Sequence, residues 1–154
     1  MIAANQLKPI AILGAGSWGT ALALYLSRRG QTVFLWSQEA SEIKALLADR
    51  ANNQFMPGFD FPETIHPTVN LAEAIAAVDD VLIAIPSAGF RKTLVLLKSV
   101  IHSTTRILCA TKGIDAEKDC FLHDAVLEIL GPQYPLAILS GQFWLGKLPI
   151  QHLQ

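Results

Sequence analysis

The residues with the clearest chemical meaning form a glycine-rich stretch, Gly14-Ala15-Gly16-Ser17-Trp18-Gly19. The stretch matches the pattern GxGxxG, directly follows an apolar run and opens an Ala/Leu-rich segment. This placement suits pyrophosphate, because Gly14 permits a tight turn, Gly16 lets a phosphate approach the backbone and Gly19 allows close helix packing. A helix that begins here also offers free N–H groups to an anion. The alternative is a tight turn that binds nothing, and the context favours dinucleotide binding.

The residues after the second predicted strand bear on which dinucleotide binds. An acidic side chain at this position binds the ribose 2′-hydroxyl of NAD, whereas a basic one suits the 2′-phosphate of NADP. The chain reads Trp36-Ser37-Gln38-Glu39, so the strand tip carries no acid, and Glu39 lies a few residues late, near a predicted helix start. The sequence therefore predicts NAD or NADP as the cofactor and does not decide between them.

Two later strands end in polar signatures, Ile85-Pro86-Ser87 and Ala110-Thr111-Lys112-Gly113. Because ligands bind beyond the carboxyl ends of parallel strands, both signatures should border the same crevice as the glycine loop. There Lys112 is a candidate to hold a substrate phosphate or polarise a carbonyl, and an exposed loop lysine is an equally good interpretation. The histidines are scattered without metal-ligand spacing, and Asp79-Asp80 fits turn chemistry better than a carboxylate pair. We therefore expect no metal site.

The elements that must position these residues alternate between strand-like and helix-like patterns along the chain. We expect strands over 10–13, 33–36, 81–85, 106–110 and 136–139, and helices over 20–29, 41–50 (capped by Ser41), 71–77, 90–101 and 117–130. Between Ala51 and Asn70, three prolines and three phenylalanines predict an irregular, packed excursion. The repeated βα units predict an α/β, Rossmann-like doubly wound fold, with a mainly parallel sheet and helices on both faces.

Composition narrows the class of protein further. The 154 residues suit one domain, and 51% of them are hydrophobic while only 16% are charged, against about 25% charged in an average domain. We expect an ordered chain, because its apolar content is high. We expect no membrane insertion, because the chain lacks a long uninterrupted apolar run. We expect no nucleic-acid binding, because the net charge is -1 and there is no basic cluster. Cys109 and Cys120, placed in a predicted strand and a predicted helix, are interpreted as buried free thiols. Met1–Pro9 lacks a secretory apolar core, so we expect a cytoplasmic protein.

These motifs together resemble one known family, the bacterial NAD(P)-dependent glycerol-3-phosphate dehydrogenases. The resemblance runs from about Pro9 to Gly141. The extended glycine motif combined with an asparagine-aromatic-proline loop is much more specific than GxGxxG. The resemblance rests on Gly14 to Ala23, Asn53-Gln54-Phe55-Met56-Pro57-Gly58, Pro86-Ser87 with Arg91, Thr111-Lys112-Gly113 and Leu139-Ser140-Gly141.

The resemblance implies an activity and a set of contacts. The family reduces dihydroxyacetone phosphate to sn-glycerol 3-phosphate with NAD(P)H, which feeds glycerophospholipid synthesis. By the same resemblance, Lys112 contacts both cofactor and substrate, and Gly141 lies at the substrate phosphate. Gln38 stands where family members usually place Arg or His, which leaves the preference for a 2′-phosphate open. The implied cofactor contacts are Gly14, Gly16, Ser17, Trp18, Gly19, Gln38, Pro86 and Lys112.

The resemblance stops abruptly after Gly141. The family continues with a pattern like Pro-x-Phe-Ala-x-Glu-Val-Ala and a helical substrate domain that holds the catalytic lysine base, whereas this chain reads Gln142-Phe143-Trp144-Leu145 and ends at Gln154. Restoring one nucleotide ahead of codon 142 permits a frame that reads Pro-(Ile/Val)-Leu-Ala-(Arg/Gly)-Glu-Val-Ala. We therefore expect residues 1–141 to be a dinucleotide-binding domain and residues 142–154 an aberrant, frameshifted tail without the helical domain. Sequencing the DNA around codon 142 tests this.

This organisation predicts a chain that binds cofactor and is nearly inactive, because the family's catalytic base lies beyond residue 154. Three hypotheses follow: the cofactor domain of a glycerol-3-phosphate dehydrogenase, a free-standing nucleotide-binding module without catalysis, or a related dehydrogenase such as a ketopantoate reductase-like or 6-phosphogluconate dehydrogenase-like protein. The high apolar content also predicts an exposed docking surface, and hence a homodimer or other self-association.

Overall fold

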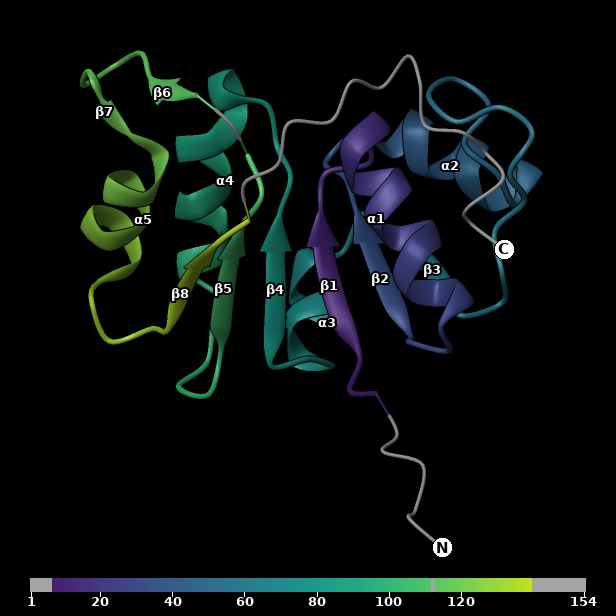
Figure 1. The fold of residues 1–154 in the computed structure, drawn as a ribbon, viewed down its shortest axis with the longest axis horizontal. Helices are drawn as coiled ribbons and strands as arrows, with labels where there is room; N and C mark the ends of the chain where they lie inside the picture. Colours follow the sequence, from purple (N-terminus) through teal and green to yellow (C-terminus); the bar gives the residue numbers. More distant parts are fainter. Residues whose placement is uncertain (1–6, 112, 140–154) are drawn as a thin grey trace, which may run out of the picture.

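The computed structural model of the chain describes residues 7–111 and 113–139, which form a parallel sheet packed between two layers of helices (Figure 1). Lys112, Gly141 and the expected tail 142–154 lie outside the described residues. The elements alternate as the sequence predicts. They are β1 (Ile10–Leu13), α1 (Ser17–Arg28), β2 (Val33–Trp36), α2 (Ala40–Asp49), β3 (Ile65–Thr68), α3 (Leu71–Ala76), β4 (Asp80–Ile83), α4 (Ser87–Lys98), β5 (Arg106–Cys109), β6 (Ile114–Asp115), β7 (Cys120–Phe121), α5 (Leu122–Leu130) and β8 (Leu136–Ile138).

The main sheet has the strand order β3-β2-β1-β4-β5-β8, and every neighbouring pair is parallel. The order reverses direction between β1 and β4, which creates the switch point where doubly wound sheets bind ligands. A separate antiparallel pair, β6 with β7, stands beside α4 and α5. The expected Rossmann-like fold is confirmed.

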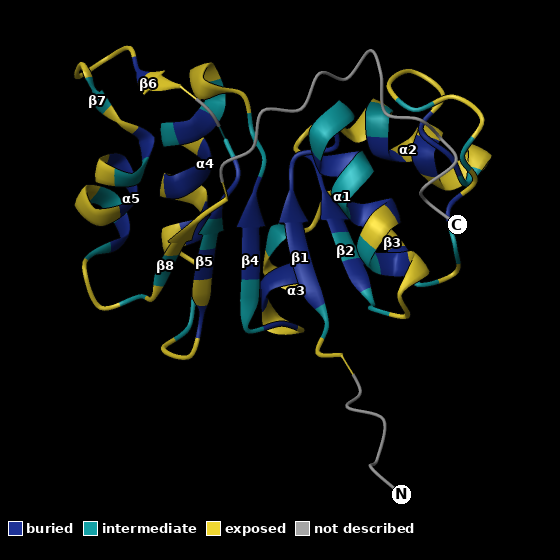
Figure 2. Cartoon of the chain, in the orientation of Figure 1, coloured by how far each residue is buried: buried dark blue, intermediate teal, exposed yellow. Residues whose placement is uncertain are grey.

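The central strands β1, β2 and β4 are buried on both faces because alternate side chains enter two separate cores. In β1, Ala11 and Leu13 belong to the core that also contains side chains of α3, α4 and α5, while Ile10 and Ile12 belong to the core with α1 and α2. All four β1 residues are at most 6% exposed. A continuous apolar run is what a strand covered on both faces requires, which explains why the short strands are so hydrophobic (Figure 2).

The segment 51–70 differs from its expectation as a wholly irregular excursion, because it contains the edge strand β3. Pro67 occupies that strand without disrupting it, since proline is tolerated at an edge where its missing N–H faces away from the ladder. The outer backbone of β3 is satisfied locally: the Ile65 N–H donates to the Pro62 carbonyl at 3.0 Å, and the Arg50 guanidinium donates to the Ile65 carbonyl at 3.1 Å. The β3 edge is therefore closed.

Most predicted helix starts differ from the structure. The helices α1 and α4 begin at Ser17 and Ser87, three residues before the predicted starts at Thr20 and Phe90. The helix expected over 117–130 begins only at Leu122, because Asp119 adopts a left-handed φ of 48° and Cys120 pairs with Asp115 in the β6–β7 ladder. Cys120 is consequently a half-buried strand residue, whereas Cys109 is buried in β5 as expected. The expected cap Ser41 lies inside α2, whose N-cap is Glu39.

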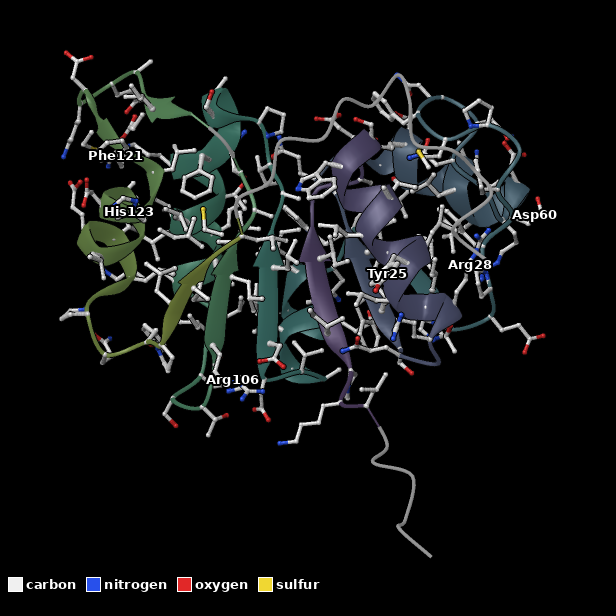
Figure 3. All side chains as sticks on the ribbon, in the orientation of Figure 1. Tyr25, Arg28, Asp60, Arg106, Phe121 and His123 are labelled. Atoms are coloured by element: carbon white, nitrogen blue, oxygen red, sulfur yellow. The ribbon has the colours of Figure 1, made fainter. Side chains whose placement is uncertain are left out.

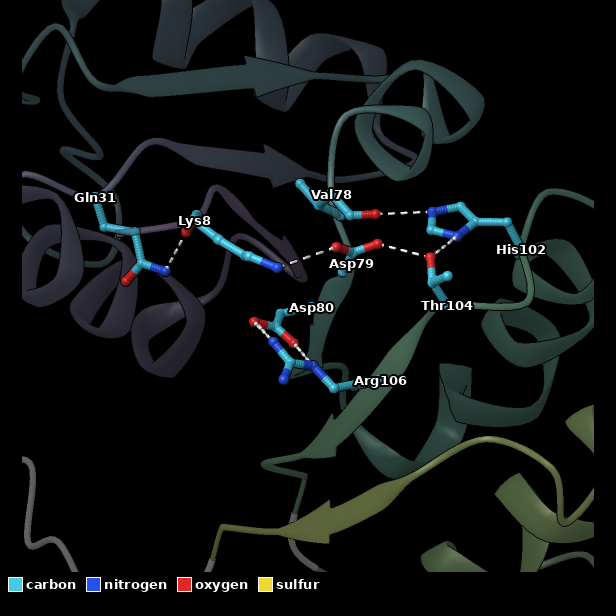
Figure 4. Close-up of polar contacts among 8 residues, drawn as sticks. All are labelled: Lys8, Gln31, Val78, Asp79, Asp80, His102, Thr104 and Arg106. Atoms are coloured by element: carbon cyan, nitrogen blue, oxygen red, sulfur yellow. Dashed lines mark hydrogen bonds and ion pairs between the residues drawn. The ribbon is translucent and has the colours of Figure 1, made fainter. Parts of the chain in front are cut away.

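A polar cluster occupies the amino ends of β4 and β5, opposite the glycine loop (Figure 4). His102 lies between the Val78 carbonyl, 2.8 Å from Nε2, and the Thr104 hydroxyl, 2.9 Å from Nδ1. Asp79 accepts from the Thr104 hydroxyl, which is the main cause of its lowered pKa, while Asp80 pairs with Arg106. The two carboxylates thus serve separate structural contacts. Within residues 7–111 and 113–139, no group of three or more His, Cys, Asp or Glu side chains is arranged to hold a metal ion.

An exposed apolar surface lies at the carboxyl ends of β5 and β8. It surrounds a hollow of about 380 Å³ whose lining includes Cys109 and Thr111. The rings of Phe121 and His123 stack beside this hollow with centroids 5.3 Å apart (Figure 3). The exposed apolar side chains of this surface are Ile114 (56%), Phe121 (62%), Ile138 (56%) and Leu139 (41%).

Across the described residues, no helix is both long and apolar enough to span a bilayer.

Candidate functional site

The site is built around the turn between β1 and α1, where two glycines are required by close approach. Gly14 has a φ of +116°, and a Cβ there would lie 2.4 Å from the Ala84 carbonyl oxygen. A Cβ on Gly19 would lie 1.9 Å from the Gly14 carbonyl oxygen. Both distances are far below any real Cβ contact, so these positions exclude other residues and hold α1 tightly against β1 and β4.

Gly16 is different, because space rather than crowding surrounds it. It is the N-cap of α1 with an ordinary φ of -74°, and a Cβ added there would meet nothing within 4 Å. The first turn of α1 holds no acidic side chain. A helix start presents N–H groups and the positive end of the macrodipole, so an anion fits the open space at Gly16. The cradle therefore fits a pyrophosphate group.

A buried asparagine that the sequence analysis did not single out ties this turn to the rest of the fold. The Asn52 amide donates to the Ala15 carbonyl at 2.9 Å and to the Thr20 hydroxyl at 2.8 Å. The Thr20 hydroxyl in turn donates to the same Ala15 carbonyl at 3.3 Å. Asn52 is 3% exposed and Thr20 is fully buried, so this network fixes the turn from beneath.

The asparagine that makes the structural contacts of this loop is therefore Asn52, one residue before the first residue of the sequence motif. Asn53, the first residue of the quoted motif, is exposed, and its amide donates to Asp49 at 3.3 Å. The Asn52 carboxamide oxygen also accepts the Phe55 N–H at 3.3 Å, which shapes the loop itself. The two adjacent asparagines look alike in the sequence, and only the fold distinguishes the buried one.

The structure brings the predicted strand ends together at one edge of the sheet. Pro86 is exposed and is the N-cap of α4, directly after β4. The Thr111 hydroxyl donates to the Ile83 carbonyl at 3.2 Å, and a Cβ on Gly113 would lie 3.8 Å from the Cβ of Ser87. The loop after β5 therefore lies against the end of β4, beside the glycine turn, as expected for one shared crevice.

The remaining predicted residues take different positions around this crevice. Ser17 and Trp18 are half-buried in the first turn of α1, and Trp18 packs against the core between α1, α2 and the sheet. Gln38 is exposed beyond the end of β2. Burial raises the pKa of the Cys109 thiol despite its weak hydrogen bond to the Thr111 carbonyl, which makes it an unreactive core residue.

An ion-pair network supports the loop that follows β5. Arg91 on α4 binds Asp115 of β6 and also Glu128 of α5, the latter at 2.8 Å. Lys118 adds a second cation to Glu128. Hydrogen bonds from Arg91 and Lys118 hold the pKa of Glu128 at about 2. The network joins α4, β6 and α5, so it anchors the β6–β7 hairpin directly after the Thr111–Gly113 loop.

Comparison with known proteins decides the family. A family model described as NAD-dependent glycerol-3-phosphate dehydrogenase N-terminus matches residues 9–143. The chain belongs to this family. The membership confirms the resemblance drawn from the motifs and favours it over a ketopantoate reductase-like protein.

Individual members of the glycerol-3-phosphate dehydrogenase family agree in sequence and in fold. The chain is 46% identical over 133 residues to glycerol-3-phosphate dehydrogenase [NAD(P)+] of Methylococcus capsulatus, covering 86% of this chain and 40% of that protein. It is 42% identical over 144 residues to the enzyme of the same name from Shewanella oneidensis, covering 94% of this chain and 43% of the relative. The crystal structure of glycerol-3-phosphate dehydrogenase from Coxiella burnetii superposes with a TM-score of 0.83 at 44% identity, covering 87% of this chain and 41% of that one. The chain therefore spans about two fifths of the length of these relatives.

Proposed function

We propose that residues 1–141 form a dinucleotide-binding domain that binds NAD(H) or NADP(H) at the β1–α1 turn. The observation that carries this proposal is the open space around Gly16, the N-cap of α1, together with the lack of an acidic side chain in the first turn of that helix. The bound dinucleotide would supply a nicotinamide that carries the hydride. The chain's own part is to hold the pyrophosphate with the backbone of the turn from Gly14 to Gly19, while Pro86 and Lys112 contact the cofactor from the neighbouring strand ends.

The relatives' names describe glycerol-3-phosphate dehydrogenases. From the family resemblance we propose that the full reaction of the longer proteins is reduction of dihydroxyacetone phosphate to sn-glycerol 3-phosphate. In this chain Lys112 and Gly141 are the proposed substrate contacts. The resemblance places the catalytic lysine outside residues 1–154, and hydride transfer to a ketone needs both a proton donor and a site closed to water. We therefore propose that the 154-residue chain binds cofactor with little or no turnover. Robust NAD(P)H-dependent reduction of dihydroxyacetone phosphate by the purified chain would refute this.

Gly16→Asp separates binding from folding in a direct test. Aspartate is among the best N-cap residues and suits the positive helix end, so the free energy of unfolding of the variant should equal or exceed that of the wild type. Its carboxylate would occupy the cradle and repel pyrophosphate, so the Kd for NADH should rise at least about tenfold. Isothermal titration calorimetry measures the Kd, and urea unfolding measures stability.

Gly16→Asn is the matched control, because it caps the helix with a side chain of the same size and no charge. We expect an intermediate Kd, since the amide fills space but does not repel phosphate. If Gly16→Asp binds NADH as tightly as the wild type, the pyrophosphate does not lie at Gly16 and the proposed site is wrong. If the wild-type chain binds neither NADH nor NADPH, the proposed function itself fails.

A further inference from the structure

The structure bears on cofactor choice at the tip of β2, which the sequence left open. In doubly wound folds this tip lies beside the adenosine ribose, where a carboxylate accepts the 2′-hydroxyl of NAD and a basic side chain pairs with the 2′-phosphate of NADP. Gln38, directly beyond the tip, is neutral and exposed. A charge at this tip that distinguishes the two cofactors would therefore have to come from another residue.

A carboxylate reaches the tip from the first turn of α2. The Ser37 hydroxyl, immediately after β2, donates to the carboxylate of Glu42. The same Ser37 oxygen accepts the Glu39 N–H at 3.2 Å. Ser37 is 8% exposed and Glu42 is half-buried, so the hydroxyl holds the carboxylate in a fixed place beside the strand end.

This arrangement has opposite consequences for the two cofactors. The second oxygen of Glu42 retains its capacity to accept from a ribose hydroxyl. A 2′-phosphate would bring a second negative group against the carboxylate, and the Ser37 proton that could have bound it is already donated to Glu42. Lys44 does not offset this charge, because residues two apart on a helix do not face each other.

We propose that Glu42, held by Ser37, is the residue that makes this chain select NAD over NADP. The inference rests on the proposed dinucleotide binding and deepens it by naming the cofactor. The sequence of the strand tip does not reveal Glu42, because this residue lies five positions beyond Ser37 and reaches back to it only when α2 has formed.

The test is the ratio of the Kd values for NADPH and NADH, measured by isothermal titration calorimetry on the full 154-residue chain. For the wild type we expect NADPH to bind at least about tenfold more weakly than NADH. Glu42→Gln keeps an acceptor for Ser37 and removes only the charge, so the ratio should fall to within about threefold of unity. Thermal unfolding followed by circular dichroism shows whether each variant is folded.

Glu39→Gln is the matched control, because it removes the same charge three positions earlier from an exposed side chain that Ser37 does not hold. This variant should retain the wild-type ratio. A wild-type chain that binds both cofactors equally, or a Glu42→Gln ratio equal to that of the wild type, overturns the assignment while dinucleotide binding stands. A ratio that moves with Glu39→Gln and not with Glu42→Gln overturns it as well. Failure of both cofactors to bind overturns the proposed function and the inference with it.

Discussion

The buried amide of Asn52 makes a quantitative prediction about how the glycine turn is held. Asn52→Leu keeps the branched shape of the side chain and removes its donated bonds to the Ala15 carbonyl and the Thr20 hydroxyl. The Thr20 hydroxyl and the Ala15 carbonyl keep their mutual bond, but the Phe55 N–H loses the Asn52 oxygen as its acceptor. Each of these three lost bonds is worth about 1 kcal/mol, so we expect a loss of about 2–4 kcal/mol in the free energy of unfolding.

Urea unfolding of the purified variant measures this loss, and NADH titration measures its effect on the turn. Stability of about 5–15 kcal/mol is normal for a domain, so the variant should fold with a clearly lower midpoint. Since Asn52 holds the carbonyl that precedes Gly16, the Kd for NADH should rise under conditions where the variant is fully folded. A change confined to the unfolding midpoint would show that Asn52 stabilises the fold without positioning the turn.

Two companion variants make the test specific. Asn53→Leu places the same substitution at the adjacent exposed position and should stay within about 0.5 kcal/mol of the wild type. Thr20→Val removes the hydroxyl that accepts from Asn52, so both substitutions break the same bond. The double variant should therefore cost less than the sum of the single effects, with a coupling of about 1 kcal/mol. If Asn52→Leu and Asn53→Leu are equally mild, the reasoning from the buried network is refuted.

Two further predictions concern close packing and charge. Gly19→Ala places a Cβ 1.9 Å from the Gly14 carbonyl oxygen, so we expect a loss of more than about 3 kcal/mol by urea unfolding, and a loss below about 1 kcal/mol would contradict the packing argument. Glu128 has a folded-state pKa of about 2 against an ordinary 4.5, so its stabilising contribution is complete above about pH 4.5 and disappears as the pH falls through about 2. The difference in Tm between the wild type and Glu128→Gln should therefore shrink across that range, and a difference independent of pH from 6 to 2 would show that the carboxylate contributes nothing by its charge.

Much of the fold could be predicted because local patterns and tertiary packing agree over most of the chain. The strands Ile10–Leu13 and Val33–Trp36 have the predicted bounds, since each is a continuous apolar run ended by polar or glycine residues. β3 was missed because its few residues include Pro67, which is acceptable only at a sheet edge. The start of α5 was missed because the left-handed backbone at Asp119 is a tertiary outcome that the helical periodicity does not reveal.

The residues of the candidate site likewise fall into those that local sequence patterns predict and those that only the folded structure reveals. The glycine turn is predictable because a strand, a tight turn and a helix start each leave a local mark within six residues. Asn52 is not predictable, because its role depends on a contact that forms only after distant segments come together. Glu42 is not predictable either, because it reaches Ser37 only when the chain turns from β2 into α2. Asn52 contacts a residue 32 positions away in the chain, and nothing in its immediate sequence distinguishes it from Asn53.

The closed outer edge of β3 limits how copies of this chain can associate. Its outward Ile65 N–H and carbonyl are bonded to Pro62 and Arg50, and Pro67 offers no N–H, whereas Ala137 and Ile138 of the opposite edge strand β8 are exposed. Among the residues that the structure describes, β8 is therefore the edge of the main sheet that remains for backbone pairing, and antiparallel pairing of two β8 strands would use this edge of both copies. Such a contact would be two-fold symmetric and closed, so one guarded edge favours pairs over an open-ended fibre.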